Sequence, residues 1–448
     1  MKTFGRRDLT QPLPEPSQDS PLSRPIALMD PDQLAVTLRA RVLKQIDPGV
    51  AADLAPSALQ RQLEQVIHDI ANEERFELSG REQMRLAEEL ANDMIGYGPI
   101  EPLLRDDQIS DILVNAPDSV YVERHGKLEL TDVQFRDNDH IASVAQKIVS
   151  RVGRRIDESS PMVDARLHDG SRVNVIFPPL ALDSPCISIR KFARQRLSLT
   201  TMIEIGTMTV GVARMLGIAA RARLNVIISG GTGSGKTMLL NAMSQMIDPG
   251  ERIITIEDAA ELRMQQRHVI RLETRPPNLE GNGQITQRDL VRNALRMRPD
   301  RIIVGEVRGP EAFDMLQAMN TGHDGSMCTI HSNTTRDALT RIENMVQMGQ
   351  FALPARAIRQ QIVSAADLIV HVERMHDGVR RVTQVSDVCN LEGDVITMND
   401  IAMYEFERED AQGHIVGHYR ASHARPSFVS RLEYFGLARA WVAANSEI

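Results

Sequence analysis

One glycine-rich stretch, Gly230-Gly231-Thr232-Gly233-Ser234-Gly235-Lys236-Thr237, constrains the fold of this chain more than any other. It matches the pattern G-x-x-x-x-G-K-[ST] of phosphate-binding loops. An apolar run of strand length, residues 225–229, precedes it, and good helix formers follow at residues 238–243. Glycines let backbone N–H groups turn toward phosphate oxygens, and the helix start adds its dipole. The stretch therefore predicts a strand, a phosphate loop and a helix in that order.

The residues of this loop are our candidates for binding a nucleotide. Lys236 would reach the β- and γ-phosphates, and the Thr237 hydroxyl would hold Mg²⁺. The alternative is a glycine-rich turn that joins a strand to a helix and binds nothing. The candidate binding residues are Gly230, Gly231, Thr232, Gly233, Ser234, Gly235, Lys236, Thr237 and Met238.

Length and composition indicate a globular protein of several domains. A chain of 448 residues is too long for one ordinary core. We expect a cytoplasmic protein, because no apolar run reaches the roughly 20 residues that span a bilayer and the N-terminus is not a secretory signal. The net charge of −8 argues against general affinity for nucleic acid. The three cysteines are too far apart in the sequence for a four-cysteine zinc site.

Changes in composition and in the spacing of apolar residues along the chain predict five segments. Prolines among polar residues indicate a disordered extension over residues 1–28. Apolar residues at helical spacing and a capping box at Ser79-Gly80-Arg81-Glu82 predict a helical segment, residues 29–95. Hairpin patterns predict a small α/β domain with a mixed or antiparallel sheet, residues 96–191. A linker, residues 192–200, then leads into residues 201–448, where alternating strands and helices predict a doubly wound parallel sheet and a β-rich C-terminal extension.

Two acidic strand ends downstream of the loop are candidates for catalysis. Catalytic groups in open parallel sheets lie beyond the carboxyl ends of strands. Glu257 ends one apolar strand and is our candidate for the base that activates water, with Asp258 and Glu261 in support. Glu306 ends another and is our candidate for holding Mg²⁺ together with Thr237. The alternative for Glu257 is a solvated acidic loop, and the alternative for Glu306 is an acid that merely ends a buried strand.

Two histidines, His323 and His331, flank a further predicted strand. A neutral imidazole can donate a hydrogen bond to phosphate, and a protonated one can sense its charge. His331 is a candidate catalytic residue on this basis. A purely structural role is equally open for such a pair.

Three arginines outside this region, Arg166, Arg172 and Arg190, form a separate candidate group. An arginine supplied by another domain or subunit can neutralise charge that develops during phosphoryl transfer. From the residues alone, a solubilising role on a hairpin is the stronger interpretation.

Long stretches of the chain resemble the ATPases of bacterial type II and type IV secretion systems, and most closely the Tad (Flp) pilus assembly ATPases of the CpaF type. The resemblance extends from about Gly96 to Gly436 and is weak over the first 95 residues. It is carried by residues 96–104, 154–167, 169–174, 189–192 and 298–332, in addition to the phosphate loop.

The resemblance implies a RecA-like P-loop domain preceded by a smaller PAS-like α/β domain. It implies a hexamer that hydrolyses ATP to ADP and phosphate with Mg²⁺, and no zinc. The motor would lie at the cytoplasmic face of the inner membrane, where it acts on pilus platform proteins and indirectly on pilin. The resemblance also implies that Arg166, Arg172 and Arg190 reach the nucleotide, that Glu257 lies in an Asp box, Glu306 in a Walker B box and His331 in a His box.

The sequence leaves rival functions open. The first is a pilus assembly motor, and the nearest alternative is a type IV secretion ATPase for conjugation or effector export, which has the same chemistry and other cargo. A nucleic-acid translocase on the same core would need a basic channel or aromatic platform. Aromatic residues make up only 4% of the chain, which disfavours it. A nucleotide-binding scaffold without turnover is disfavoured by Lys236, Glu257 and Glu306.

Overall fold

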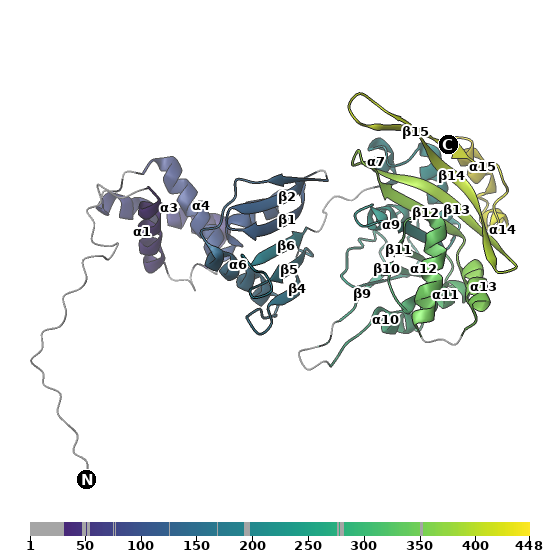
Figure 1. Ribbon diagram of the computed structural model, residues 1–448, viewed down its shortest axis with the longest axis horizontal. Coiled ribbons are helices and arrows are strands. Elements are labelled where there is room, and N and C mark those ends of the chain that lie inside the picture. Colours follow the sequence, from purple (N-terminus) through teal and green to yellow (C-terminus); the bar gives the residue numbers. More distant parts are fainter. Residues whose placement is uncertain are drawn as a thin grey trace, which may run out of the picture. The chain divides into compact units, whose positions relative to one another are not determined.

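The computed structural model describes residues 31–46, 51, 54–74, 76, 78–124, 126–167, 169–191, 198–275, 277, 282–349 and 353–448. The expected disordered extension, residues 1–28, lies outside these ranges, as does most of the expected linker, residues 192–197. The chain divides into two compact units, Met1–Lys191 and Phe192–Ile448 (Figure 1). No helix in the described ranges is long and apolar enough to cross a membrane.

The first unit begins with a small helical bundle. Leu59, Leu63 and Ile67 recur at helical spacing and are fully buried in its core. The predicted capping box is present: the Ser79 hydroxyl accepts from the Glu82 N–H, and the Glu82 carboxylate accepts from the Ser79 N–H at 2.7 Å. The helices are α1 (Pro31–Gln45), α3 (Pro56–Glu74) and α4 (Gly80–Ile95).

An antiparallel sheet forms the rest of the first unit and confirms the predicted α/β class. Its strand order is β3-β2-β1-β6-β5-β4, and every pairing in it is antiparallel. Alternate residues such as Val173 and Val175 pack with Ile141 and Ile148 of helix α6 in one core. The elements are η3 (Gly98–Ile100), α5 (Glu101–Arg105), β1 (Ile109–Ala116), β2 (Ser119–Arg124), β3 (Lys127–Leu130), α6 (Asn138–Arg151), β4 (Met162–Arg166), β5 (Arg172–Ile176) and β6 (Cys186–Arg190).

Polar contacts at the end of α4 join the helical bundle to this sheet domain. The Asp93 carboxylate accepts from Arg136 at 2.8 Å and from the His140 imidazole at 3.2 Å. Lys147 of α6 donates to the backbone carbonyls of Asp93 and Met94, at 2.9 and 2.7 Å. Burial lowers the pKa of this lysine to about 8. The last turn of α4 is thus capped by a cation from the neighbouring domain.

The second unit contains a nine-stranded sheet in the order β15-β14-β13-β12-β7-β11-β10-β8-β9, as far as the chain is described. Its strands from β12 to β9 are parallel neighbours, and β13 to β15 are added antiparallel to β12. The predicted doubly wound, RecA-like parallel sheet is confirmed. The strands are β7 (Val226–Gly230), β8 (Ile253–Glu257), β9 (Val269–Glu273), β10 (Arg301–Val307), β11 (Met327–His331), β12 (Leu368–Arg374), β13 (Arg380–Glu392), β14 (Val395–Glu409) and β15 (Ile415–Ala421).

Helices cover both faces of this sheet (Figure 1). One core gathers α7 (Leu199–Glu204), α8 (Val210–Arg221), α9 (Lys236–Ser244), α14 (Val429–Tyr434) and α15 (Ala438–Asn445). The other core gathers α10 (Gln287–Ala294), α11 (Glu311–Asn320), α12 (Thr335–Met348) and α13 (Ala355–Ala365). Because β7, β11, β10 and β8 are covered on both faces, they are almost wholly apolar, as buried parallel strands are.

The C-terminal extension differs from its prediction in one respect. The alternating pattern around Tyr404 predicts short strands, but β13 has 13 residues and β14 has 15. Apolar and polar residues alternate only weakly in the exposed parts of β13 and β14. The sequence pattern therefore shows where these strands lie but not how long they are. Their pairing with β12 joins the extension to the same sheet as the phosphate loop.

Candidate functional site

The phosphate loop follows β7, as the sequence predicts, and its glycines are required by close packing. A Cβ on Gly230 would lie 2.2 Å from the Val372 carbonyl oxygen, which no side chain tolerates. Gly235, at φ 100°, is the N-cap of α9 in the left-handed region that favours glycine. The loop is therefore pressed against β12 and ends at a helix N-terminus, where backbone N–H groups and the helix dipole favour an anion.

Lys236 lies within this loop. Its Nζ donates to the carbonyl oxygens of Gly230 at 2.9 Å and Gly231 at 2.7 Å. Burial lowers the pKa of Lys236, and the nearby Glu306 carboxylate opposes that change. The lysine thus engages the loop's own carbonyl groups, and phosphate oxygens are stronger acceptors for the same cation.

The carboxyl ends of four parallel strands bring the predicted groups to one edge of the sheet. His331, the last residue of β11, pairs in register with Gly230 at the end of β7. Val304 of β10 pairs with Ile256 of β8, so Glu306 and Glu257 follow at the same edge. Each of these residues comes from a different strand, and the sheet alone places them with the phosphate loop.

Glu257 has the most unusual environment of the predicted residues. Its side chain is buried, and one carboxylate oxygen accepts from the N–H groups of Glu261 at 2.8 Å and Leu262 at 2.9 Å. The other oxygen is buried without a hydrogen-bond partner among the described residues. Burial raises the pKa of Glu257 to about 7, although the two N–H donors oppose this. Gly305 permits this position, since a Cβ there would lie 2.7 Å from Glu257 Cγ.

Arg308 joins the two acidic clusters and was missed by the sequence analysis. Its guanidinium forms an ion pair with Glu306 and lies 3.6 Å from an Asp258 carboxylate oxygen. The hydrogen bond to Glu306 raises the pKa of Arg308. Its position two residues after Glu306, on the same side of the strand end, was the available signal. Glu306 is therefore neutralised by a neighbouring cation rather than left as an isolated charge.

His371 of β12 was also missed, because a histidine inside an apolar strand gives no signal in the sequence. It is buried, and its Nδ1 lies 2.9 Å from the Ser229 hydroxyl, beneath the phosphate loop. Burial and the charge of Lys236 lower its pKa. A neutral imidazole is the form that suits this position.

The two histidines of the predicted pair lie at opposite edges of the sheet. His331 ends β11 at the carboxyl edge, beside the phosphate loop. His323 precedes β11 at the amino edge, where its Nδ1 lies 3.3 Å from the Ala318 carbonyl oxygen. A strand of five residues separates them, so only His331 lies near the candidate site.

The oxygen donors at the carboxyl edge are of the kind that would suit Mg²⁺ if it bound together with a nucleotide. Thr237 supplies a hydroxyl in the first turn of α9, and Glu306 supplies a partly buried carboxylate whose present partner, Arg308, a metal ion would replace or share. Oxygen donors of this kind suit Mg²⁺, which usually keeps several waters and phosphate oxygens as its other ligands. No group of three or more His, Cys, Asp or Glu side chains that could hold a metal ion is present in the described part of the chain.

The three candidate arginines of the first unit lie in one row across its sheet. Arg166 of β4 pairs in register with Arg172 of β5, which pairs with Arg190 of β6. Directly opposed residues share a face of the sheet, so the three side chains point to the same side. Arg190 also forms an ion pair at 3.1 Å with Asp111 of β1, the next residue of the row. The row therefore places three arginines and one aspartate on the face opposite α6.

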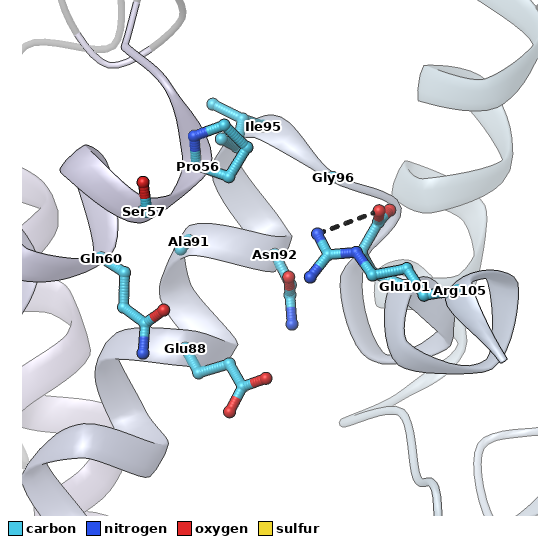
Figure 2. Close-up of a pocket in the computed structure, with 10 residues that line it drawn as sticks. All are labelled: Pro56, Ser57, Gln60, Glu88, Ala91, Asn92, Ile95, Gly96, Glu101 and Arg105. Atoms are coloured by element: carbon cyan, nitrogen blue, oxygen red, sulfur yellow. Dashed lines mark hydrogen bonds and ion pairs between the residues drawn. The ribbon is translucent and has the colours of Figure 1, made fainter.

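A pocket of about 410 Å³ lies in the first unit, between α3, α4 and α5 (Figure 2). Ser57 and Gln60 of α3 line one side, and the ion pair of Glu101 with Arg105 lines the other (Figure 2). Its lining contains no glycine loop and includes the acidic Glu88, so its chemistry does not suit a phosphate. The phosphate-loop edge, defined by residue geometry, is the better candidate site.

Comparisons with known proteins agree with this geometry. Residues 93–401 match the family described as type II/IV secretion system protein. A putative conjugal transfer protein of Mycobacterium tuberculosis is 38% identical over 312 residues, which cover 68% of this chain and 88% of the relative. The type IV secretion system protein VirB11 of Brucella suis is 30% identical over 311 residues, covering 63% and 86%.

The crystal structure of the VirB11 ATPase from the same Brucella secretion system also aligns with this chain. It is 29% identical, with a TM-score of 0.35, and the alignment covers 64% of this chain and 94% of that one. The family match covers more than half of the chain and contains the phosphate loop and both acidic strand ends. The chain therefore belongs to the type II/IV secretion system protein family, the superfamily of secretion ATPases.

Proposed function

We propose that this chain is an ATP-hydrolysing motor of a type IV secretion system of the conjugal-transfer kind. The observation that carries the reaction is Glu257, a buried carboxylate with one oxygen held by two N–H groups and the other unpaired, at the edge that holds the phosphate loop. Such a group is suited to accept a proton from water.

In the proposed reaction, the phosphate loop binds the triphosphate through its N–H groups and Lys236. Glu257 accepts a proton from a water molecule as its oxygen attacks the γ-phosphorus, and the bond to the β-phosphate oxygen breaks to give ADP and phosphate. Mg²⁺, held by Thr237 and Glu306, would neutralise phosphate charge when bound. A pKa of about 7 for Glu257 is close to the operating pH, where general bases are most effective.

His331 and the arginines have supporting roles in this proposal. His331 adjoins the loop and can donate to a phosphate oxygen. Arg166, Arg172 and Arg190 form a basic row that can neutralise charge in the transition state when it is brought to a nucleotide, in the same or a neighbouring subunit. A ring of subunits, which we propose to be a hexamer at the inner membrane, would provide such an approach.

The cargo is proposed from the relatives' names. Those named above are a conjugal transfer protein and a type IV secretion protein, so they support secretion better than Tad pilus assembly. Disruption of the gene in its source organism should reduce conjugal transfer and leave the number of Tad pili on the cell surface unchanged. Loss of Tad pili with normal transfer would instead support the pilus motor.

The enzymatic part is tested by Lys236→Ala in the full chain. We expect Mg²⁺-dependent phosphate release to fall at least about 100-fold, because the main cation at the γ-phosphate is removed. The melting temperature should not decrease, since Lys236 binds only the carbonyls of its own loop. Lys127→Ala, an exposed lysine on β3, is the matched control. Equal turnover in wild type and Lys236→Ala would refute the proposal.

A further inference from the structure

Arg380, the first residue of β13, lies across the phosphate loop although it belongs to the C-terminal extension. Its Nε donates to the Gly233 carbonyl oxygen at 2.9 Å. Its Cδ is 3.1 Å from the point where a Cβ on Gly235 would lie. The stem of the arginine therefore covers Gly235 while its guanidinium holds Gly233. We propose that Arg380 is a positioning residue of the nucleotide site, an inference that rests on the proposed function.

The hydrogen bond acts on the loop through the geometry of the peptide group. A trans peptide is planar, so its C=O and the following N–H point in opposite directions. Because Arg380 holds the Gly233 carbonyl, the Ser234 N–H on the other side of the same peptide points back into the loop, where it donates to the Gly231 carbonyl oxygen at 3.4 Å. Lys236 holds two other carbonyls of the loop, those of Gly230 and Gly231, from within the loop. Arg380 thus helps to keep the loop in the form in which its N–H groups meet an anion.

The base of β13 is anchored firmly enough to hold Arg380 in place. The Asp377 carboxylate accepts from Arg381 at 3.0 and 2.8 Å, and from the backbone N–H groups of Val379 and Ile415, each at 3.0 Å. Burial opposes ionisation of Asp377, but these donors together lower its pKa to about 2. Adjacent residues of a strand point to opposite faces, so Arg381 points toward this anchor and Arg380 toward the loop.

The inference gives the C-terminal extension a part in nucleotide binding. The turn before β13 is linked to β15 through Asp377 and Ile415, and to the phosphate loop through Arg380. A change of loop conformation on binding ATP or releasing ADP would alter the hydrogen bond between Arg380 and Gly233. The hydrogen bond from Arg380 to Gly233 lies at the surface rather than in the core.

The test compares nucleotide affinity with stability in the full chain. Dissociation constants for Mg-ATP and Mg-ADP are measured by calorimetry for wild type, Arg380→Ala and Arg380→Lys, with Arg408→Ala as an exposed arginine control on β14. We expect Arg380→Ala to weaken the binding of both nucleotides about 3- to 10-fold, the size of one ordinary hydrogen bond, because the bond is exposed and acts on the nucleotide only through the loop. KM should rise with little change in kcat, and the ligand-free melting temperature should stay within about 1 °C, because surface changes alter stability little.

The outcomes separate this inference from the proposed function. Arg380→Lys should recover part of the affinity, since a lysine keeps the charge but loses the fixed Nε–H. If wild type binds Mg-ATP and Arg380→Ala binds it within about twofold, the inference is wrong and the proposed function stands. If wild type itself binds no nucleotide, both are wrong. Destabilisation of the ligand-free Arg380→Ala protein with unchanged affinity would assign Arg380 a structural role and overturn the inference.

Discussion

Replacing Glu257 by glutamine should make the protein more stable at pH 8 while abolishing hydrolysis. Burial raises the pKa of Glu257 from its ordinary 4.5 to about 7. Each pKa unit corresponds to about 1.4 kcal/mol, so ionisation in the folded protein is about 3 kcal/mol less favourable than in the unfolded chain. Glutamine has nearly the same shape and never ionises, so it removes this cost.

The sign of the effect with pH follows from proton binding. Between pH 4.5 and pH 7 the folded protein keeps a proton on Glu257 that the unfolded chain has lost. Stability contributed by this group is complete below pH 4.5 and is lost as the pH rises through 7. Wild type and Glu257→Gln should therefore be about equally stable at pH 5, and the variant should be more stable at pH 8.

The assay is thermal unfolding of the full chain at pH 5 and pH 8. A gain of about 1–3 kcal/mol corresponds to a rise of roughly 3–9 °C in the melting temperature of the second unit, given the usual enthalpy for its size. The contributions of other titrating groups to the pH dependence cancel, because only the difference in melting temperature between wild type and variant is used. Glu392→Gln replaces an exposed glutamate and should show no difference at either pH.

The accompanying kinetic measurement should show that kcat falls about 100-fold or more, the usual contribution of a general base. In the wild type, kcat should rise with pH through about 7, as Glu257 loses its proton. A melting difference that is the same at pH 5 and pH 8, or that favours wild type at pH 8, would refute the buried-carboxylate argument. Retained hydrolysis in the variant would refute its role as the base.

Two further predictions concern packing around the same sheet. Gly305→Ala places a methyl group 2.7 Å from Glu257 Cγ, so hydrolysis should fall and the free energy of unfolding should decrease by about 1–3 kcal/mol. Phosphate release and thermal melting check this, and wild-type activity in the variant would contradict it. Arg301 is fully buried, with bonds of 2.6 and 2.9 Å to Glu251. Arg301→Met should cost roughly 3 kcal/mol, because it leaves the buried Glu251 carboxylate with only the longer ion pair to Arg223, at 3.4 Å. The double variant with Glu251→Met should recover much of this loss in urea denaturation, and equal stability of the single and double variants would disprove the pairing argument.

Much of the second unit could be predicted from the sequence, because buried parallel strands are short, apolar and bounded by turns. The phosphate loop, β7 and α9 lie where the glycine pattern places them, Glu257 ends β8 as expected, and Glu306 is the last residue but one of β10. Local chemistry was enough for these features, since the loop, the strand ends and the capping box at Ser79 each depend on neighbours within a few residues.

Contacts between distant segments could not be predicted. Arg308 forms an ion pair with Asp258, and Arg380 donates a hydrogen bond to Gly233, which lies 147 residues away in the sequence. His323 and His331 look like a pair in the sequence, but the strand between them carries them to opposite edges of the sheet. The row of Arg166, Arg172 and Arg190 depends on strand register, which the spacing of arginines along the chain does not contain.

The sequence by itself determined that a phosphate loop is present and which strands end in acids, because these are local patterns with fixed spacing. Only the tertiary structure decided which oxygen of Glu257 is held and which is left unpaired, and why its pKa is raised. Burial and hydrogen bonding are properties of surroundings assembled from several strands, and a linear pattern does not specify them. For the same reason, eight consecutive residues identify the phosphate loop in the sequence, whereas the contact of Arg380 with that loop is visible only in the tertiary structure.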